Sequence, residues 1–286
     1  MPAPVVTKSE IMKGLRQLGL TPGMRLMVHS SLSSFGYVEG GAHAVVEALM
    51  ELLTPEGTLL MPTFNHGAPF GDGGLEYYHP EETPTINGAI PDRFWRTDGV
   101  ARSLNPTHPF AAWGRDHRRY TENHHRTLTM GPESPLGLLH RDDGYCLLLG
   151  VDYRSNTFHH VVETSTGAPC LGRRTEAYPV VLPDGRRVLG RTWGWRARSC
   201  PFTDSNRYAD EMVDKQRVAV IGRCRALLYR LRDCYSVVAR ILAQGKQGFP
   251  PCDGCPIRPR RVPQTVPSDW DEARQCLKPD SVALTY

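Results

Sequence analysis

A histidine and a glutamate lie three residues apart within residues 156–163, which read NTFHHVVE. If these residues are helical, His160 and Glu163 share one face of the helix, because side chains three positions apart are neighbours there. A carboxylate beside an imidazole fixes the tautomer of the ring and raises its basicity, as a general base near neutral pH requires. The pair is therefore a candidate for proton transfer. A surface pair, or a buried histidine with internal hydrogen bonds, is the alternative.

A loop rich in serine is the second candidate. Residues 29–36 read HSSLSSFG and lie between a predicted strand, residues 25–29, and a predicted helix, residues 42–53. Small residues between a strand and a helix N-terminus can form an anion site, because backbone N–H groups point outward and the helix dipole adds positive potential. The loop is neither a P-loop nor a GxGxxG turn, so a plain serine-rich turn is the alternative.

An arginine and a serine begin the third candidate, residues 102–109, which read RSLNPTHP. A guanidinium group and hydroxyl groups near the end of a strand can bind phosphate. An ordinary loop is the alternative for this segment.

The elements that must position these segments follow from the spacing of apolar residues. Residues 25–29 and 58–64 predict buried strands, and residues 42–53 predict the helix between them, which is the pattern of a parallel βαβ crossover. Residues 145–151, YCLLLGV, predict another buried strand, and the NTFHHVVE segment follows its carboxyl end. Ligands bind at that edge of open α/β sheets, so His160 is expected at a ligand-binding edge.

The remaining segments complete the predicted organisation. Residues 66–87 form a long excursion rich in glycine and proline, and loops of that length are usually functional or mobile. Residues 177–182 and 187–189 flank a Pro-Asp-Gly turn and predict an antiparallel hairpin. Thr7 and Glu10 have the spacing of a capping box at the start of a helix, and residues 206–214 and 233–244 predict further helices. We expect a single domain over residues 1–248 and a tail rich in proline and arginine over residues 249–286.

Composition excludes several classes of protein. The 286 residues carry a net charge of +4 and are 40% hydrophobic, an ordinary balance for a globular protein. No apolar run approaches the roughly 18 residues of a membrane span, and the N-terminus lacks the pattern of a signal peptide. The eight cysteines are too dispersed for a disulfide scaffold, so we expect a cytoplasmic location. Cys252 and Cys255 form one CxxC pair without a second pair at zinc spacing, and we assign no metal.

Taken together, the motifs resemble a known family. HSSLSSFGYVEGG, GTLLMPTF, RSLNPTH, GPESPLGLL, LLLGV and the NTxxHxxE block occur in an order similar to that of the aminoglycoside 3-N-acetyltransferase family, over residues 11–233. The HSS loop and the NTxxHxxE block are the specific parts, and the strand fragments are generic. The resemblance implies a three-layer α/β/α sandwich with a largely parallel central sheet and a small antiparallel hairpin. It also implies transfer of acetyl from acetyl-CoA to the 3-amino group of an aminoglycoside antibiotic.

The resemblance also assigns roles to individual residues. By motif, His160 would be the general base and Glu163 its orienting partner, while His159 is out of register with the motif histidine. The loop of residues 30–36 would lie against the pantetheine and pyrophosphate of CoA, and residues 61–64 would line the acetyl end. The implied coenzyme contacts are His29, Ser30, Ser31, Ser34, Phe35, Gly36, Met61, Thr63, Arg102 and Ser103.

Two departures from the family pattern concern the third segment and the acceptor. Asn105 and Pro106 stand where many relatives have His-Pro, and Pro109 stands where they have serine. No acid follows the MPTF strand directly, although some aminoglycoside-using relatives have one there. The candidates for contact with the acceptor are Phe64, Asp72, Glu82 and Asp204. Glu76 and Glu81 are further candidates on the long loop, and Asp204 and Asp210 compete with the acids of that loop.

Three rival hypotheses remain open. A relative with the same fold can acetylate a different amine in biosynthesis. A serine hydrolase would use Ser30 or Ser31 as nucleophile and His160 as base, but the G-x-S-x-G elbow is absent. A binding module would use the basic run of Arg258, Arg260 and Arg261. We expect a monomer or homodimer with a small-molecule amine as partner and with neither nucleic acid nor membrane.

Overall fold

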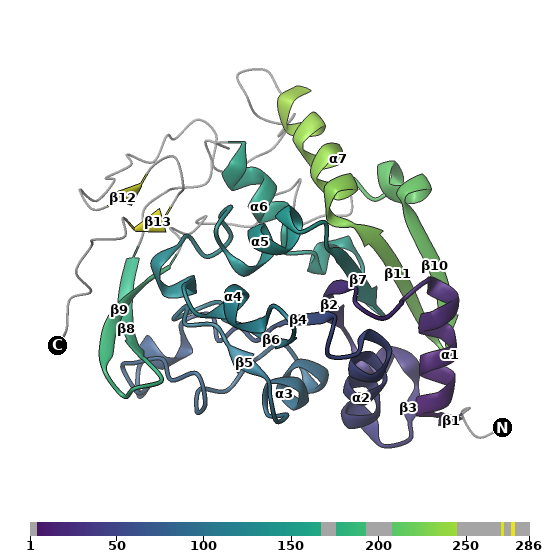
Figure 1. Cartoon of the computed structure of the whole chain (residues 1–286), viewed down its shortest axis with the longest axis horizontal. Coiled ribbons are helices and arrows are strands. Elements are labelled where there is room, and N and C mark those ends of the chain that lie inside the picture. The colour runs from purple at the N-terminus through teal and green to yellow at the C-terminus, as the bar shows by residue number, and fades with distance from the viewer. Residues whose placement is uncertain (1–4, 167–175, 193–207, 245–269, 272–275, 278–286) are drawn as a thin grey trace.

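A seven-stranded sheet forms the centre of the molecule, with the strand order β10-β11-β7-β2-β4-β6-β5 (Figure 1). The computed structural model describes residues 5–166, 176–192, 208–244, 270–271 and 276–277. The strands of this sheet are β2 (Arg25–Ser30), β4 (Thr58–Pro62), β5 (Ala101–Arg102), β6 (Phe110–Gly114), β7 (Tyr145–Leu149), β10 (Gln216–Ile221) and β11 (Cys224–Arg230).

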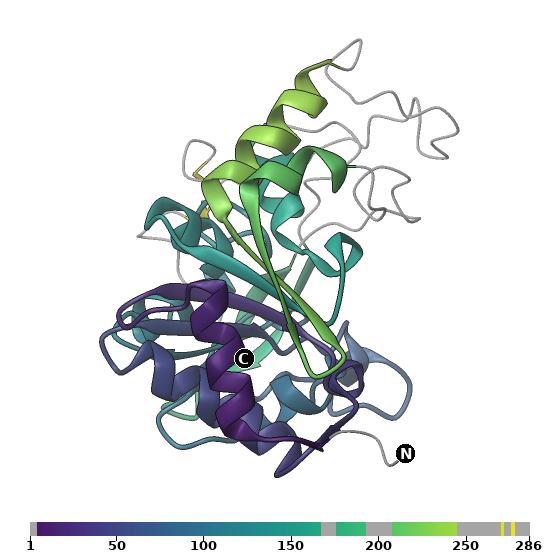
Figure 2. The same cartoon turned by 90° about the vertical axis from the view of Figure 1, so that its right-hand side faces the viewer.

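Helices cover both faces of the sheet and give the expected α/β/α sandwich. They are α1 (Lys8–Leu18), α2 (Gly41–Leu53), α3 (Ala89–Trp95), α4 (His117–Thr121), α5 (Pro135–Arg141), α6 (Phe158–Ser165) and α7 (Leu231–Gln244). Figure 1 shows α5, α6 and α7 above the sheet and α2 and α3 below it, and α1 packs beside β10 (Figure 2).

Alternation along each strand builds two hydrophobic cores, one on each face. Leu26 and Val28 of β2 are completely buried against α1 and α2, whereas Met27 between them faces the core that includes α5, α6 and α7. Burying a side chain of this size contributes roughly 1.5–3 kcal/mol. Strands apolar on both sides therefore occupy the middle of the sheet.

The sheet is mixed, and the expectation of a largely parallel sheet holds only for its centre. β2 pairs in parallel with β4 and with β7, but the pairs β4–β6, β5–β6, β7–β11 and β10–β11 are antiparallel. Antiparallel neighbours can be joined by short turns, whereas parallel ones need a crossover. Ile221 pairs with Cys224, so only Gly222 and Arg223 separate β10 from β11. This short connection adds antiparallel strands to the sheet, and they are absent from the elements expected from the sequence.

Several local predictions are confirmed. Thr7 caps α1 with both hydrogen bonds of a capping box, and the predicted hairpin is the two-stranded sheet of β8 (Glu176–Val181) and β9 (Arg187–Thr192). α7 contains the helix expected at residues 233–244. The helix expected at residues 206–214 is a 3₁₀ helix, η5 (Asp210–Lys215), in its described part. The remaining short elements are β1 (Val5–Val6), β3 (Tyr37–Val38), η1 (Leu32–Phe35), η2 (Ala68–Phe70), η3 (His124–Arg126), η4 (Tyr153–Ser155), β12 (Trp270–Asp271) and β13 (Cys276–Leu277).

The long excursion of residues 66–87 is fastened to the hairpin. The backbone N–H of Tyr78 donates to the carbonyl of Pro179 at 2.9 Å, and that of Val181 donates to the carbonyl of Tyr78 at 2.9 Å. Phe70 stacks on Tyr178 with ring centroids 4.3 Å apart. The excursion and the hairpin are therefore connected by backbone and aromatic contacts.

Two further predictions concern the C-terminal tail and membrane-spanning helices. Apart from β12 and β13, the predicted tail lies outside the described residues, as do Asp204, Cys252 and Cys255. Within the described part of the chain, no helix is both long enough and apolar enough to cross a membrane.

Candidate active site

One edge of the sheet gathers the candidate segments. β2, β4 and β7 end there, because β2 runs parallel to both of its neighbours. β6 is antiparallel to β4, and Phe110 pairs with Pro62, so the residues that precede β6 lie at the same edge. Four segments therefore lie around the edge at which ligands bind in α/β sheets. They are the serine loop after β2, the MPTF segment, residues 102–109 and the NTFHHVVE segment.

His160 and Glu163 meet on α6 as their spacing predicts. Nδ1 of His160 lies 2.8 Å from Oε2 of Glu163, and the Glu163 side chain is completely buried while that of His160 is 21% exposed. An ionised carboxylate only accepts hydrogen bonds, so Nδ1 of His160 is the donor in this contact. The contact with the buried carboxylate fixes the orientation of the ring.

The first turn of α6 is held by buried polar contacts. The Nδ2 of Asn156 donates to the hydroxyl of Tyr208 at 3.0 Å, and its Oδ1 accepts from the backbone N–H of Phe158 at 3.1 Å. His159 is 2% exposed, and its Nδ1 lies 3.4 Å from the same tyrosine hydroxyl. His159 thus packs against Tyr208 in the interior, whereas His160 is the partly exposed ring of the two.

A buried histidine joins the two specific motifs. Nε2 of His29 accepts hydrogen bonds from the backbone N–H of Thr157 at 3.4 Å and from its Oγ1 at 3.3 Å. Burial lowers the pKa of His29 to about 3, so the ring is neutral and its Nε2 can accept. The contact ties the end of β2 to the start of α6.

The serine loop forms the short helix η1 and packs closely against the end of β7. Ser34 Oγ donates to the carbonyl of Ser31 at 2.7 Å, and the backbone N–H of Ser31 donates to the carbonyl of Leu149 at 2.9 Å. Gly150 has a φ of 74°, and a Cβ on it would lie 1.7 Å from Ser34 Oγ. Ser30, Ser31, Ser34 and Gly36 are partly buried, and Phe35 is buried.

The other predicted coenzyme residues are buried and hydrogen-bonded within the protein. Arg102 donates from Nε to Thr63 Oγ1 at 3.1 Å, from Nη2 to the carbonyl of Thr63 at 2.9 Å and from Nη1 to the carbonyl of Thr83 at 2.6 Å. Ser103 Oγ accepts from the backbone N–H of Phe110 and contacts Nδ1 of His124, both at 2.8 Å. Met61 is completely buried. These buried side chains hold together the segments that form the ligand-binding edge.

The acceptor candidates are divided between an aromatic cluster and an exposed loop. Phe64 is 3% exposed and packs against His108 and Phe110, with ring centroids 4.9 Å and 5.2 Å away. Asp72 and Glu82 are exposed on the excursion. His108 lies in the third candidate segment but received no role of its own from the sequence, and neither did its neighbour His66, although His66 follows β4 and His108 precedes β6 at the ligand-binding edge.

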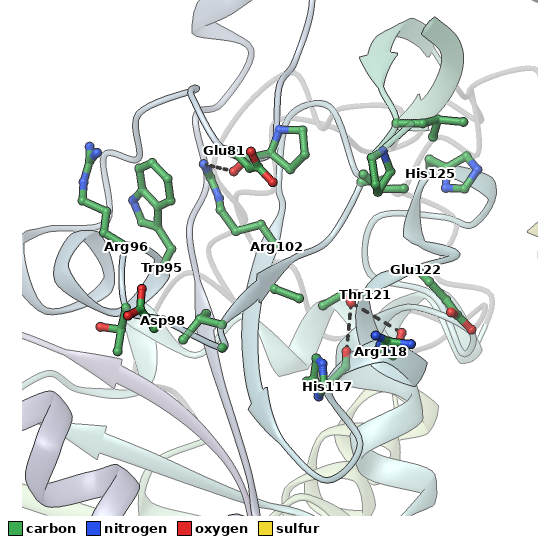
Figure 3. A pocket seen from close by; sticks show the side chains of 18 residues that line it. Glu81, Trp95, Arg96, Asp98, Arg102, His117, Arg118, Thr121, Glu122 and His125 are labelled. Carbon is green, nitrogen blue, oxygen red and sulfur yellow. Dashed lines mark hydrogen bonds between the residues drawn. The ribbon is translucent and has the colours of Figure 1, made fainter. Parts of the chain in front are cut away.

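A pocket of about 1020 Å³ lies beside the edge strand β5, and its lining includes neither His160 nor Glu163. Figure 3 shows Trp95, Arg96 and Arg102 on one side and Arg118 and Glu122 of the α4 region on the other. The lining mixes acidic and basic groups. The pocket therefore does not define a site for a ligand of one charge.

Known proteins resemble this chain along most of its length. A family profile described as aminoglycoside 3-N-acetyltransferase matches residues 27–243. The chain is 37% identical over 245 residues to the SPbeta prophage-derived aminoglycoside N(3')-acetyltransferase-like protein YokD of Bacillus subtilis (strain 168), covering 79% of this chain and 89% of that protein. It is 32% identical over 271 residues to aminoglycoside N(3)-acetyltransferase IV of Salmonella sp, covering 92% and 97%.

Solved structures agree with the sequence comparison. The crystal structure of the aminoglycoside acetyltransferase AAC(3)-IVa, a histidine-to-alanine mutant in complex with gentamicin, matches with a TM-score of 0.74 and 30% identity over 90% of this chain and 96% of that one. The fold shared with these structures and the family match over residues 27–243 agree on one class of protein. The chain belongs to the aminoglycoside 3-N-acetyltransferase family and is an acetyltransferase.

The close approach of Gly150 to the serine loop generates a prediction with a matched control. Gly150→Ala should destabilise the protein by about 3 kcal/mol, because it adds a clash with Ser34 to the cost of a positive φ. Gly185→Ala, at a φ of 82° with nothing within 4 Å of its Cβ, should cost only about 1 kcal/mol. Urea unfolding measures both, and equal losses would show that the contact does not constrain the loop.

Proposed function

We propose that this protein is an acetyl-CoA-dependent N-acetyltransferase that acetylates the 3-amino group of an aminoglycoside, with His160 as general base and Glu163 as its orienting partner. The observation that carries the proposal is the 2.8 Å hydrogen bond between the two side chains at the ligand-binding edge of a member of this family. The relative from Salmonella is named for this reaction, and the AAC(3)-IVa structure contains gentamicin.

The base is needed because the acceptor nitrogen must lose protons to become an amide. An ammonium group has no lone pair, so the acceptor reacts as the neutral amine, and that amine loses a further proton as its nitrogen attacks the thioester. His160 takes that proton on Nε2 while its Nδ1–H stays on Glu163. The carboxylate stabilises the imidazolium that forms, and the protein needs no covalent intermediate.

The serine loop is the proposed coenzyme site. Its partly buried residues Ser30, Ser31, Ser34 and Gly36 lie at the end of β2, and the His29–Thr157 contact joins this end to the helix of the base. Backbone N–H groups of the loop suit the pyrophosphate and the developing oxyanion. In this proposal Met61, Thr63, Arg102 and Ser103 hold the loops in place from behind, with Thr63 hydrogen-bonded to the carbonyl of Pro109 at 2.9 Å.

The acceptor is proposed to bind between the aromatic cluster around Phe64 and the excursion of residues 66–87. Aminoglycosides carry several ammonium groups, which favour carboxylates within hydrogen-bonding distance. Asp72 and Glu82 supply exposed carboxylates on that excursion. Asp204, the other acid proposed for this role, lies outside the described residues.

The hydrolase alternative lacks the contact that it needs. Ser31 Oγ pairs with Ser33 Oγ at 3.2 Å, and Ser30 Oγ is buried without a hydrogen-bond partner. A serine nucleophile requires a hydrogen bond to its base, and within the described residues neither serine donates to His160. The geometry therefore favours direct transfer from the thioester to the amine.

A thiol-release assay tests the proposed function. The enzyme should release CoA from acetyl-CoA only when an aminoglycoside with an unmodified 3-amino group is present, because transfer needs that nitrogen as nucleophile. Compounds already acetylated at this position serve as the control. Release without any amine would favour hydrolysis, and release with the blocked compounds would place the acetyl group elsewhere.

Substitution of the pair tests the mechanism. His160→Ala should lower kcat by about a hundred- to ten-thousand-fold, because the proton then has no positioned acceptor. CoA binding measured by calorimetry should stay within about threefold of the unaltered enzyme, since the serine loop is intact.

A conservative change at the second residue separates charge from geometry. Glu163→Gln keeps an acceptor for Nδ1–H but removes the negative charge, so it should lower kcat less than His160→Ala does. Glu47→Gln, at a partly exposed position of α2, is the control. An unchanged kcat in His160→Ala would show that His160 is not the general base.

A further inference from the structure

Asn105, which departs from the family pattern, holds the turn before β6. Its Oδ1 accepts from the backbone N–H of Thr107 at 3.2 Å and from that of His108 at 2.9 Å. Two donors fix which end of the amide is oxygen. The Nδ2 group therefore faces Thr129 Oγ1 at 3.2 Å and the carbonyl of Arg191 at 3.1 Å, and it donates to both.

A row of buried hydroxyl groups leads from this amide to an imidazole. Thr129 Oγ1 lies 3.3 Å from Thr192 Oγ1, Thr192 Oγ1 contacts Thr107 Oγ1, and Thr107 Oγ1 lies 2.8 Å from Nδ1 of His108. Each hydroxyl has one proton to donate. Thr107 Oγ1 also lies 3.4 Å from Asn105 Oδ1, but that oxygen already accepts two N–H bonds and the contact with Nδ1 of His108 is shorter. Because Asn105 donates to Thr129 at the start of the row, donation in the same direction along the row makes Nδ1 of His108 an acceptor. The ring then carries its proton on Nε2, on the side away from Thr107.

The ring of His108 lies in the aromatic cluster at the ligand-binding edge. Its centroid is 4.9 Å from that of Phe64 and 4.7 Å from that of His66. Burial lowers the pKa of His108 well below its ordinary value, and the imidazoles of His66 and His160 lower it further. His108 is therefore a neutral imidazole within electrostatic reach of the general base.

We propose that His108 is a further catalytic residue of the acetyl transfer, and that its Nε2–H donates a hydrogen bond to the carbonyl oxygen of the acetyl group. The inference rests on the proposed function. The amine nitrogen forms a bond to the carbonyl carbon, its proton passes to Nε2 of His160, and the carbonyl electrons move onto the oxygen opposite His108. When the C–S bond breaks, these electrons restore the carbonyl and the bonding pair leaves with the CoA sulfur.

A neutral ring suits this task better than a second base would. An imidazole whose Nε2 already bears a proton cannot accept one from the acceptor ammonium, whereas it can donate to a developing oxyanion. A fixed donor in a water-poor site needs no reorganisation as the charge develops, which is the origin of its effect on rate. The hydroxyl row and Asn105 are positioning groups in this scheme, since they act through His108.

The tautomer can be measured without any turnover. The full chain with ¹⁵N-labelled histidine gives a long-range ¹⁵N–¹H correlation spectrum, and His108→Gln assigns the signal of His108 by its loss. We expect the Nε2–H tautomer in the unaltered protein and a change in the tautomer ratio in Thr107→Val, which removes the last hydroxyl of the row. An Nδ1–H tautomer in the unaltered protein would overturn the proposal.

Kinetics test the catalytic role itself. His108→Leu should lower kcat by about a hundredfold, the usual effect of losing one oxyanion donor, with the KM for acetyl-CoA within about threefold. His108→Gln returns an N–H group near the same place and should recover at least about tenfold of that loss. His43→Leu, at an exposed position on α2, controls for the loss of a histidine.

The outcomes separate the two proposals. Calorimetric binding of CoA by His108→Leu shows that the variant is folded. If kcat is unchanged in His108→Leu while His160→Ala is slow, only the role of His108 is overturned. If the unaltered enzyme releases no thiol with any aminoglycoside, the proposed function fails, and the role of His108 fails with it.

Discussion

The hydrogen bond from Nδ1 of His160 to Oε2 of Glu163, 2.8 Å long, is the interaction on which the rest of the site depends. The carboxylate is completely buried, and a buried charge is costly unless a partner compensates it. The imidazole provides that partner and is oriented in return. Since both side chains belong to one turn of α6, the pair exists only while that turn stays helical and in place.

Much of the surrounding structure serves to keep that turn in place. Asn156 and Tyr208 hold it from the interior, and His29 holds it from the end of β2 through Thr157. Burial keeps His29 neutral, so the ring that connects the two motifs acts as an acceptor and not as a cation. The buried hydroxyl row and Asn105 fix the turn that carries His108. The edge is thus built from rigid contacts between segments that are far apart in the sequence.

The sequence predicts what depends on local spacing. The three-residue interval of His160 and Glu163 and the capping box at Thr7 are local, and the structure contains both contacts. The burial of Arg102 could not be predicted, because its partners at Thr63 and Thr83 come from distant segments.

Two other features could not be predicted from local sequence patterns either. The antiparallel strands β10 and β11 are recognisable only through the short Gly222–Arg223 connection. The grouping of His66 and His108 around Phe64 depends on the antiparallel direction of β6, which residue spacing does not fix.

The most direct test of the role of His160 is a crystal structure of the full chain with CoA and an aminoglycoside bound together. We expect the 3-amino nitrogen within roughly 3.2 Å of His160 Nε2, the CoA sulfur beside that nitrogen and the hydrogen bond between His160 and Glu163 intact. A coenzyme sulfur bound away from this imidazole would contradict it.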